Sequence, residues 1–371
     1  MRFIDQEKFE KIVRFARRTN PFYARWIPPG GPVPIMTRRM VLENNTELLN
    51  GHPVAGMTSG SSGMPVNVAS GPDRGKMEIR DNMTILRWLG GPMPRLPILY
   101  PLEWRPRKNL IPISTPIPQQ AEGIRDFASR HDIFSILTYP SNAKLLAQYL
   151  GDKGISFPSV HRVLLMSEPL DSGQRALIRQ AFPNALIWIT YSATELGIIS
   201  CQCPFEPDFQ HIMSHKLGVE IVDAGGQAVP FGQVGRLVCT DYYNCQMPFI
   251  RYALGDLASF GQCPCGKIPL PAFSQVLGKV RGALLHRDGR RETFAFFADA
   301  FEDLPGIRQY QVIQEAIHRF TVNLVITQKV DAEVRAIFLK EFGYENQVDI
   351  VYMDEIPRDP NGKFYASICK V

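Results

Sequence analysis

Residues 133–195 read IFSILTYPSNAKLLAQYLGDKGISFPSVHRVLLMSEPLDSGQRALIRQAFPNALIWITYSATE, and this stretch decides the fold. Its apolar runs at 133–139, 162–166 and 185–191 have the length of buried strands. The segments between them, near 141–151 and 171–182, have helical spacing, and the second opens with an Asp171/Gln174 capping pattern. Strands that alternate with helices indicate a doubly wound, mainly parallel α/β sheet.

The same alternation extends toward the N-terminus, with apolar runs at 97–100 and 109–113 followed by a helical stretch near 119–130. Residues 6–17 also have helical spacing. Between 217 and 260 the pattern changes to short strands separated by turns, which predicts hairpins or a small β-barrel-like part.

The C-terminal region predicts a compact α+β unit. Helices are expected near 292–303 and 331–342, and strands near 307–314, 318–327 and 347–352. About 90 residues are enough for a small domain of its own. We therefore expect a large N-terminal domain over 1–281 and a small, mobile C-terminal domain over 282–371.

Composition narrows the class of protein. The chain has 371 residues, 45% hydrophobic and 21% charged, which suits two or three globular domains. It contains no apolar run long enough for a membrane span, and its first residues lack the apolar region of a signal peptide, so a cytoplasmic location is expected. The net charge of +5 is spread along the chain, which argues against nucleic-acid binding and is compatible with an anionic small molecule or an acidic partner protein.

Residues 58–68, TSGSSGMPVNV, combine glycines with many small hydroxyl donors. Glycine lets a backbone approach a ligand closely, and hydroxyls with exposed N–H groups can bind anionic oxygens. The stretch is therefore either a phosphate-binding loop or a flexible Ser/Gly linker. It has neither Walker nor Rossmann spacing, so the choice depends on the rest of the chain.

Five stretches occur in one order along the chain. They are TSGSSGMP at 58–65, SEPL at 167–170, YSATE at 191–195, RYALGD at 251–256 and IPRDPNGK at 356–363. In order and spacing they resemble the motifs of the adenylate-forming ligases, the acyl-CoA synthetase superfamily. The short N-terminal region and CPCGK at 263–267 are most similar to its phenylacetate-CoA ligase-like branch. Val66 replaces a lysine common in the superfamily, and Val280–Ala283 depart from its usual hinge sequence.

The resemblance implies that ATP and Mg²⁺ activate a carboxylic acid, which is then transferred to the thiol of CoA or of phosphopantetheine. It implies catalytic roles for Lys363, which would bridge the carboxylate and the α-phosphate, for Thr194 at the α-phosphate, and for Glu195 at Mg²⁺. It places Tyr191 beside adenine and Asp256 on the ribose hydroxyls. The remaining residues that the resemblance assigns to ATP are Thr58, Ser59, Gly60, Ser61, Ser62, Gly63, Ser167, Glu168, Pro169 and Arg281.

The seven cysteines include two tight pairs, Cys201/Cys203 and Cys263/Cys265. In a chain without an export signal, metal ligation or reduced thiols are better readings than disulfides. Cys203, His211, Cys263 and Cys265 would form a structural zinc site with three thiolates and one imidazole. Cys201 and His215 compete as ligands, and two reduced, metal-free pairs are the alternative.

The acid is expected to be aryl or arylalkyl, because the pocket residues that the resemblance implies include aromatic side chains and because the branch that the chain resembles is phenylacetate-like. Long-chain acids are the alternative. The implied pocket residues are Tyr139, Trp188, Ser192, Ala193 and Leu196, with Ser167 shared with the nucleotide. Three functions compete: an acid:CoA ligase, an enzyme that loads an acyl carrier protein, and an inactive nucleotide-binding homologue. The expected partners are therefore a small carboxylic acid with CoA or a carrier protein, and a homodimer is also compatible.

Overall fold

The computed structural model describes residues 2–58, 65–91, 98–100, 110–132, 134–168, 170, 172–279, 284–289, 291–292, 300–301, 304–343, 345–358 and 364–371. Among the helices in these ranges, none is both long and apolar enough to cross a bilayer. The expected boundary at 281/282 and the capping residue Asp171 lie outside the described residues.

Parallel strands form one half of the main sheet, in the order β9-β8-β7-β5-β6. The strands are β5 (Ile98–Tyr100), β6 (Leu110–Pro112), β7 (Phe134–Thr138), β8 (Val160–Met166) and β9 (Leu186–Ala193), and the helices beside them are α6 (Ile117–Ala128), α7 (Pro140–Asp152) and α8 (Ser172–Ala181). Apolar side chains of the helices and of β7, β8 and β9 bury one another in a single core. This half confirms the predicted α/β fold class.

The antiparallel strands join this sheet at β9, because β10 pairs with β9 in the opposite direction. Within the described residues the sheet has 13 strands, so the part predicted to be barrel-like continues the main sheet. The added strands are β1 (Arg2–Phe3), β2 (Met36–Thr37), β10 (Gly197–Gln202), β11 (Gln210–Ile212), β12 (Leu217–Val222), β13 (Gly235–Asp241), β14 (Tyr252–Gly261) and β15 (Ala272–Lys279).

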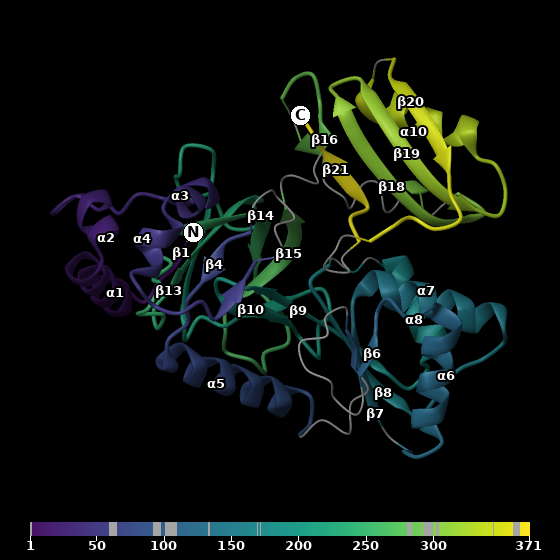
Figure 1. The fold of residues 1–371 in the computed structure, drawn as a ribbon, viewed down its shortest axis with the longest axis horizontal. Coiled ribbons are helices and arrows are strands. Elements are labelled where there is room, and N and C mark those ends of the chain that lie inside the picture. The colour runs from purple at the N-terminus through teal and green to yellow at the C-terminus, as the bar shows by residue number, and fades with distance from the viewer. Residues whose placement is uncertain are drawn as a thin grey trace.

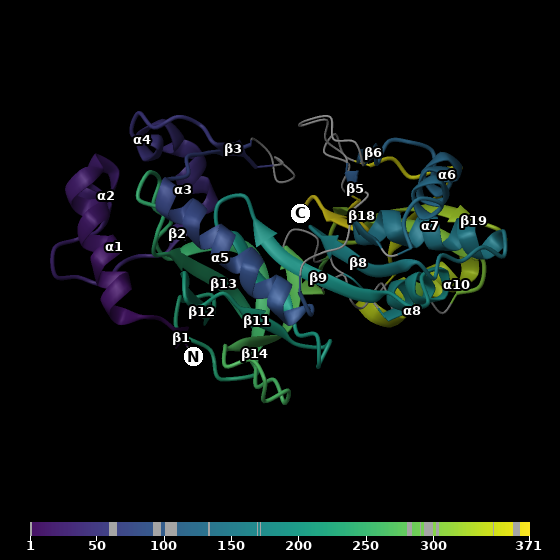
Figure 2. The same cartoon turned by 90° about the horizontal axis from the view of Figure 1, so that it is seen from below.

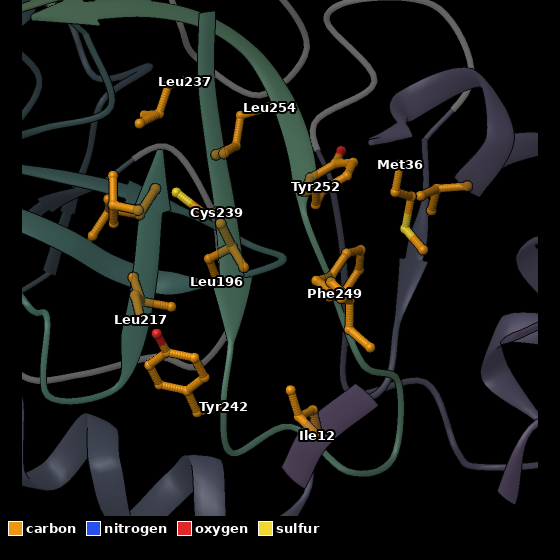
Figure 3. Close-up of a cluster of buried hydrophobic side chains, with 14 of the residues drawn as sticks. Ile12, Met36, Leu196, Leu217, Leu237, Cys239, Tyr242, Phe249, Tyr252 and Leu254 are labelled. Atoms are coloured by element: carbon orange, nitrogen blue, oxygen red, sulfur yellow. The ribbon is translucent and has the colours of Figure 1, made fainter. Parts of the chain in front are cut away.

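The N-terminal helices cover this antiparallel half. They are α1 (Gln6–Thr19), α2 (Pro21–Trp26), α3 (Arg38–Glu43) and α4 (Asn45–Leu49). Figure 3 shows the core between them, where Ile12 of α1 and Met36 of β2 lie in one cluster with Tyr252 of β14 and with Leu196 of the turn before β10. A short hairpin of β3 (Gly56–Met57) and β4 (Asn67–Val68) precedes α5 (Pro72–Trp88), which runs alongside the antiparallel half (Figure 2).

A separate sheet lies near the C-terminus in the order β20-β19-β18-β21, with its own hydrophobic core. Its elements are β18 (Ile307–Ala316), β19 (Arg319–Ile326), α10 (Asp331–Phe342), β20 (Gln347–Tyr352) and β21 (Ser367–Cys369), preceded by β16 (Leu284–Leu285) and β17 (Arg291–Glu292). The predicted helix at 292–303 is wrong at its start, where Glu292 pairs with Leu284 in a short β-ribbon. Residues 284–371, called here the C-terminal unit, lie beside α7 and α8 (Figure 1).

Candidate active site

The turn between β9 and β10 carries Thr194 and Glu195. It lies at the carboxyl end of β9, the edge where open α/β sheets bind ligands. Gly197 closes the turn with a φ of +66°, and a Cβ built there would lie 2.8 Å from a carboxylate oxygen of Glu78. Only glycine fits this position without a shift of its neighbours, so the backbone fixes where Glu195 is presented.

Glu195 is buried and has two polar neighbours on one oxygen. Arg38 Nη1 lies 3.2 Å from Glu195 Oε1, and the Tyr252 hydroxyl donates to the same oxygen at 3.0 Å. Burial raises the pKa of Tyr252, and Glu195 acts in the same direction, so the phenol stays a neutral donor. Glu195 is therefore a fixed carboxylate that can offer oxygen to a hard cation.

Arg38 also contacts the first residue of the Ser/Gly loop, because its Nη2 donates to Thr58 Oγ1 at 3.0 Å. That oxygen accepts the Val66 N–H as well, and the Thr58 N–H donates to the Val66 carbonyl. Hydrogen bonds between Thr58 and Val66 thus hold the two ends of the predicted phosphate loop together. The Arg38 guanidinium connects these ends to Glu195. The sequence reasoning missed Arg38, whose only signal was its place after the short strand β2.

Tyr191 and Asp256 meet across the sheet, where the Tyr191 hydroxyl donates to a carboxylate oxygen of Asp256. Tyr191 comes from β9 and Asp256 from β14. Burial is the main cause that raises the pKa of Tyr191 well above its usual value, and the charge of Asp256 adds to it. Tyr191 therefore stays protonated and orients the carboxylate.

A group of buried charged side chains packs against the turn between β9 and β10. Arg74 of α5 donates from Nη2 to the Thr194 carbonyl at 3.0 Å and lies 3.7 Å from Asp241. Two turns further along α5, Asp81 lies 2.5 Å from Lys216 Nζ and 2.7 Å from His215 Nε2. Lys216 is fully buried, and its Nζ lies 3.3 Å from the Cβ position of Gly197. We call Arg74, Asp81, Lys216 and Asp241 the α5 charge cluster.

The residues predicted to line the acid pocket do not form one apolar group. Trp188 is buried with Leu164, Cys201 and Met213, and its indole N–H donates to the Gln202 carbonyl at 2.6 Å. Leu196 belongs to the larger core of the antiparallel half. Tyr139 is buried before α7, while Ser192 and Ala193 are half-buried on β9 and follow Trp188 along that strand.

Several predicted site residues fall outside the described ranges. They are Ser59, Gly60, Ser61, Ser62, Gly63, Pro169, Arg281 and Lys363. Ser167 and Glu168 are described at the end of β8, and Glu168 contacts the C-terminal unit through the N–H of Phe364, at 2.8 Å. Phe364 directly follows Lys363 in the sequence.

A second group of side chains has the chemistry of a metal centre. The ligand atoms of Cys203, His211, Cys263 and Cys265 all lie within 4.8 Å of one another. His211 Nδ1 lies 3.1 Å from the Leu270 carbonyl, which can only accept, so Nδ1 carries the proton. In the neutral ring Nε2 then holds the lone pair, and it faces Cys265 Sγ at 3.6 Å.

The two competing ligands lie elsewhere. Cys201 is fully buried in the cluster around Trp188, and burial raises the pKa of its thiol well above the usual value. The Nε2 atom of His215 contacts Asp81. The structure therefore brings together the predicted set of three cysteines and His211 without either alternative.

Comparisons with known proteins give both a sequence relative and a fold. Residues 284–370 match the family model described as the CapK C-terminal domain. A phenylacetate-coenzyme A ligase of Thermus thermophilus is 28% identical over 186 residues, 48% of this chain. The match spans only 41% of the length of that ligase.

Solved structures of CoA ligases have a similar fold. The 2-hydroxyisobutyryl-CoA ligase in its postadenylation state, in complex with 2-HIB-AMP, matches with a TM-score of 0.77, covering 98% of this chain and 88% of that chain at 16% identity. The same ligase in its thioesterification state matches with a TM-score of 0.60, over 99% and 91% at 17% identity. The resemblance to the adenylate-forming superfamily is confirmed, together with its fold class.

Proposed function

We propose that this chain activates a carboxylic acid with ATP as an acyl-adenylate and then transfers the acyl group to CoA. The observation that carries the proposal is the link from Thr58 through Arg38 to Glu195, which joins the neck of a phosphate-type loop to a buried carboxylate. Both half-reactions develop charge on phosphate oxygens, so pre-positioned donors and cations are the catalytic means available.

In the first half-reaction a carboxylate oxygen of the acid attacks the α-phosphorus of ATP. The bond to the bridging oxygen breaks, and pyrophosphate leaves with the electron pair. In the second, the thiol sulfur attacks the acyl carbonyl carbon, AMP leaves, and the thiol proton passes to solvent. The products are AMP, pyrophosphate and the thioester.

The residues of the site divide this work. We assign Thr58 and Arg38, which hydrogen-bond each other, to the β- and γ-phosphates, and Thr194, the neighbour of Glu195, to the α-phosphate. Mg²⁺, when bound, supplies neutralisation of phosphate charge, and the buried carboxylate of Glu195 is the residue that would hold it. The Asp256 carboxylate, oriented by Tyr191, accepts from the ribose hydroxyls. Lys363 and Arg281 take their roles from the resemblance alone.

The proposed acid is aromatic, supported by the phenylacetate-coenzyme A ligase relative. Trp188 on β9 and Tyr139 after β7 are buried aromatic residues on strands that β8 separates, so they do not by themselves define a pocket. The proposed acceptor is CoA. Loading of a phosphopantetheine arm on an acyl carrier protein is the alternative, because the chemistry of its thiol is the same.

The test is acid-dependent release of pyrophosphate and AMP across aryl, arylalkyl, hydroxy and long-chain acids. Each acid is assayed with CoA and with holo carrier protein. We expect AMP rather than ADP, strict dependence on Mg²⁺, and loss of activity in Glu195→Gln. The variant Glu206→Gln, on the loop after β10, is the matched control. ADP as product would overturn the proposal, because ATP would then be cleaved at another bond. Binding of Mg-ATP without release of pyrophosphate with any acid would overturn it in favour of an inactive nucleotide-binding homologue.

The cysteine centre is proposed to be a structural zinc site. Three thiolates and one imidazole form one of the usual closed tetrahedral sets. Cys203 and His211 come from the β10–β11 hairpin, and Cys263 and Cys265 from the connection between β14 and β15. A bound ion would therefore tie the segment after Glu195 to the segment after Asp256.

A further inference from the structure

Glu168 lies at the junction between the parallel half of the sheet and the C-terminal unit. Its Oε1 accepts the N–H of Phe364 at 2.8 Å, and its Oε2 accepts the N–H of Ser141 at 2.9 Å. Ser141 lies in the first turn of α7, and Phe364 lies in the C-terminal unit. One carboxylate thus hydrogen-bonds both bodies at once.

An arginine from the C-terminal unit completes the contact. Arg358 Nη1 donates to Ser141 Oγ at 2.7 Å and lies 4.0 Å from Glu168 Oε1. The Glu168 side chain is 6% exposed and that of Arg358 is 13% exposed. Hydrogen bonds to an ionised group are about twice as strong as neutral ones, and burial strengthens them further.

The charge of Glu168 depends on this contact. Burial raises the pKa of Glu168, whereas the N–H groups of Phe364 and Ser141 and the charge of Arg358 act in the opposite direction. Separation of the C-terminal unit would remove Phe364 and Arg358 together. The carboxylate would then have to find water in their place, so its full set of partners exists only in the docked arrangement.

The backbone before Glu168 is strained. Ser167 has a φ of +68°, in the left-handed region that a serine rarely adopts. Such a residue costs on the order of 1 kcal/mol and persists where the surroundings require it. Here it turns the chain at the end of β8, and Glu168 follows directly.

We propose that Glu168 is a positioning residue that docks the C-terminal unit for the adenylation half-reaction. It accepts the peptide N–H of Phe364, the residue after Lys363. Arg358, also in the C-terminal unit, joins the same junction through Ser141 and its charge beside Glu168. This role is separate from the nucleotide contact that the resemblance implied, because its partners are protein N–H groups, one on each oxygen of Glu168. The inference rests on the proposed function, which gives the docked arrangement a reaction to serve.

The overall arrangement agrees with an adenylation role. The chain resembles the postadenylation state of 2-hydroxyisobutyryl-CoA ligase more closely than its thioesterification state, with TM-scores of 0.77 and 0.60 at nearly equal coverage. The compared ligase is the same protein in both cases, so the two scores differ between two of its states and not between two sequences.

The same junction supplies a matched control. Arg308 of the C-terminal unit pairs with Asp152 of α7 at 3.3 Å, with the two side chains 51% and 54% exposed. An exposed pair of this kind contributes little, because water and salt screen it. Asp152→Asn therefore changes a charge between the same two bodies without removing a buried contact.

The experiment compares Glu168→Gln, Arg358→Gln and Asp152→Asn in the full chain. Glutamine keeps the shape of Glu168 and one acceptor, but its NH₂ group cannot accept from the second N–H. In single-turnover assays we expect Glu168→Gln and Arg358→Gln to slow acyl-adenylate formation by roughly tenfold or more, as for loss of a charge-assisted contact. We expect the KM for ATP and thioester formation from supplied acyl-adenylate to stay unchanged, and Asp152→Asn to match wild type.

Hydrogen exchange gives a readout that needs no activity. Peptides that contain Phe364 should exchange faster in Glu168→Gln and Arg358→Gln than in wild type and Asp152→Asn. Unchanged exchange would overturn the contact itself. Faster exchange with normal adenylation, a raised KM for ATP at an unchanged maximal rate, or equal loss in both half-reactions would each overturn the positioning role. If wild type forms no acyl-adenylate, the proposed function fails, while exchange still decides whether Glu168 docks the unit.

Discussion

The hydroxyl of Tyr191 donates a hydrogen bond to the carboxylate of Asp256, which joins β9 to β14 in the candidate site. Both residues are named in motifs more than 50 residues apart in the sequence, and the sheet brings them together. The pair makes one unit, in which the tyrosine sets the direction of the acceptor that the ribose would need.

Tyr191→Phe removes this donor and leaves the shape of the ring intact. A buried acceptor that loses a partner costs about 1–3 kcal/mol, so we expect affinity for AMP to fall roughly tenfold. Isothermal titration with AMP measures it. Tyr149→Phe, on α7 beside the parallel core, is the control and should bind AMP as wild type does. Unchanged AMP affinity in Tyr191→Phe would show that the pair does not serve the nucleotide.

Arg38→Gln tests the cation between Thr58 and Glu195. Loss of one pre-positioned charge at a phosphate site should slow adenylation by roughly 10². The same change removes a positive charge 3.2 Å from Glu195, so Mg²⁺ should reach half-saturation at a lower concentration. Mg²⁺ titrations of the adenylation rate measure both effects. Arg39→Gln is the control, because it removes the exposed ion pair that the next residue, Arg39, makes with Glu43. A raised Mg²⁺ requirement in Arg38→Gln would contradict this reading.

The α5 charge cluster predicts a large stability effect from one substitution. Asp81→Asn leaves Lys216 buried beside a neutral amide, and breaking a buried pair in this way costs about 3–5 kcal/mol. Asp73→Asn on the same helix breaks the exposed pair with Lys76 and should cost under about 1 kcal/mol. Urea denaturation followed by tryptophan fluorescence compares the two. The double variant Asp81→Asn/Lys216→Met should recover part of the loss, and no recovery would mean that the charges are not coupled.

Removal of metal tests the cysteine centre. We expect about one zinc per chain after preparation without chelators, and loss of it in Cys265→Ser, because a three-ligand site binds more weakly. Elemental analysis measures the content. Cys201→Ala and Cys245→Ser should keep the metal, since the first thiol lies beside Trp188 and the second is exposed. Zinc lost from Cys201→Ala at normal secondary structure would transfer the ligand role to that residue.

The parallel half was readable from the sequence because its strands are continuous apolar runs and its helices keep a regular apolar face. The strand at 134–138 lies within the predicted run at 133–139, and the strand at 160–166 contains the predicted run at 162–166, for this reason. The motifs also pointed to Glu195, which follows β9, and to Asp256, which lies within β14 and not in the turn that its neighbour Gly255 suggested. Periodicity carries no information on which strands pair at a distance, so the single continuous sheet was not predicted.

Contacts between segments far apart in the chain were also beyond the sequence. Arg38 meets Glu195 from 157 positions away, and Glu168 meets Phe364 from 196 positions away. Neither partner has a local pattern that names the other, because an arginine after a short strand or a glutamate before a proline is common on any surface. Lys216 is similar: a lone lysine predicts exposure, and only its partner Asp81 explains its burial.

The variant Lys363→Ala separates the chemical step of adenylation from docking of the C-terminal unit. If the Lys363 ammonium bridges the carboxylate and the α-phosphate, Lys363→Ala should slow acyl-adenylate formation by roughly 10² or more, as for loss of a transition-state donor. Thioester formation from supplied acyl-adenylate should survive, because the bond to phosphorus already exists. Lys370→Ala, which removes an exposed ion pair with Glu315 in the same unit, is the control. Exchange at Phe364 should stay as in wild type in Lys363→Ala but rise in Glu168→Gln, since only the second loses the docking carboxylate. Equal loss in both half-reactions of Lys363→Ala would assign the adenylation step to another residue.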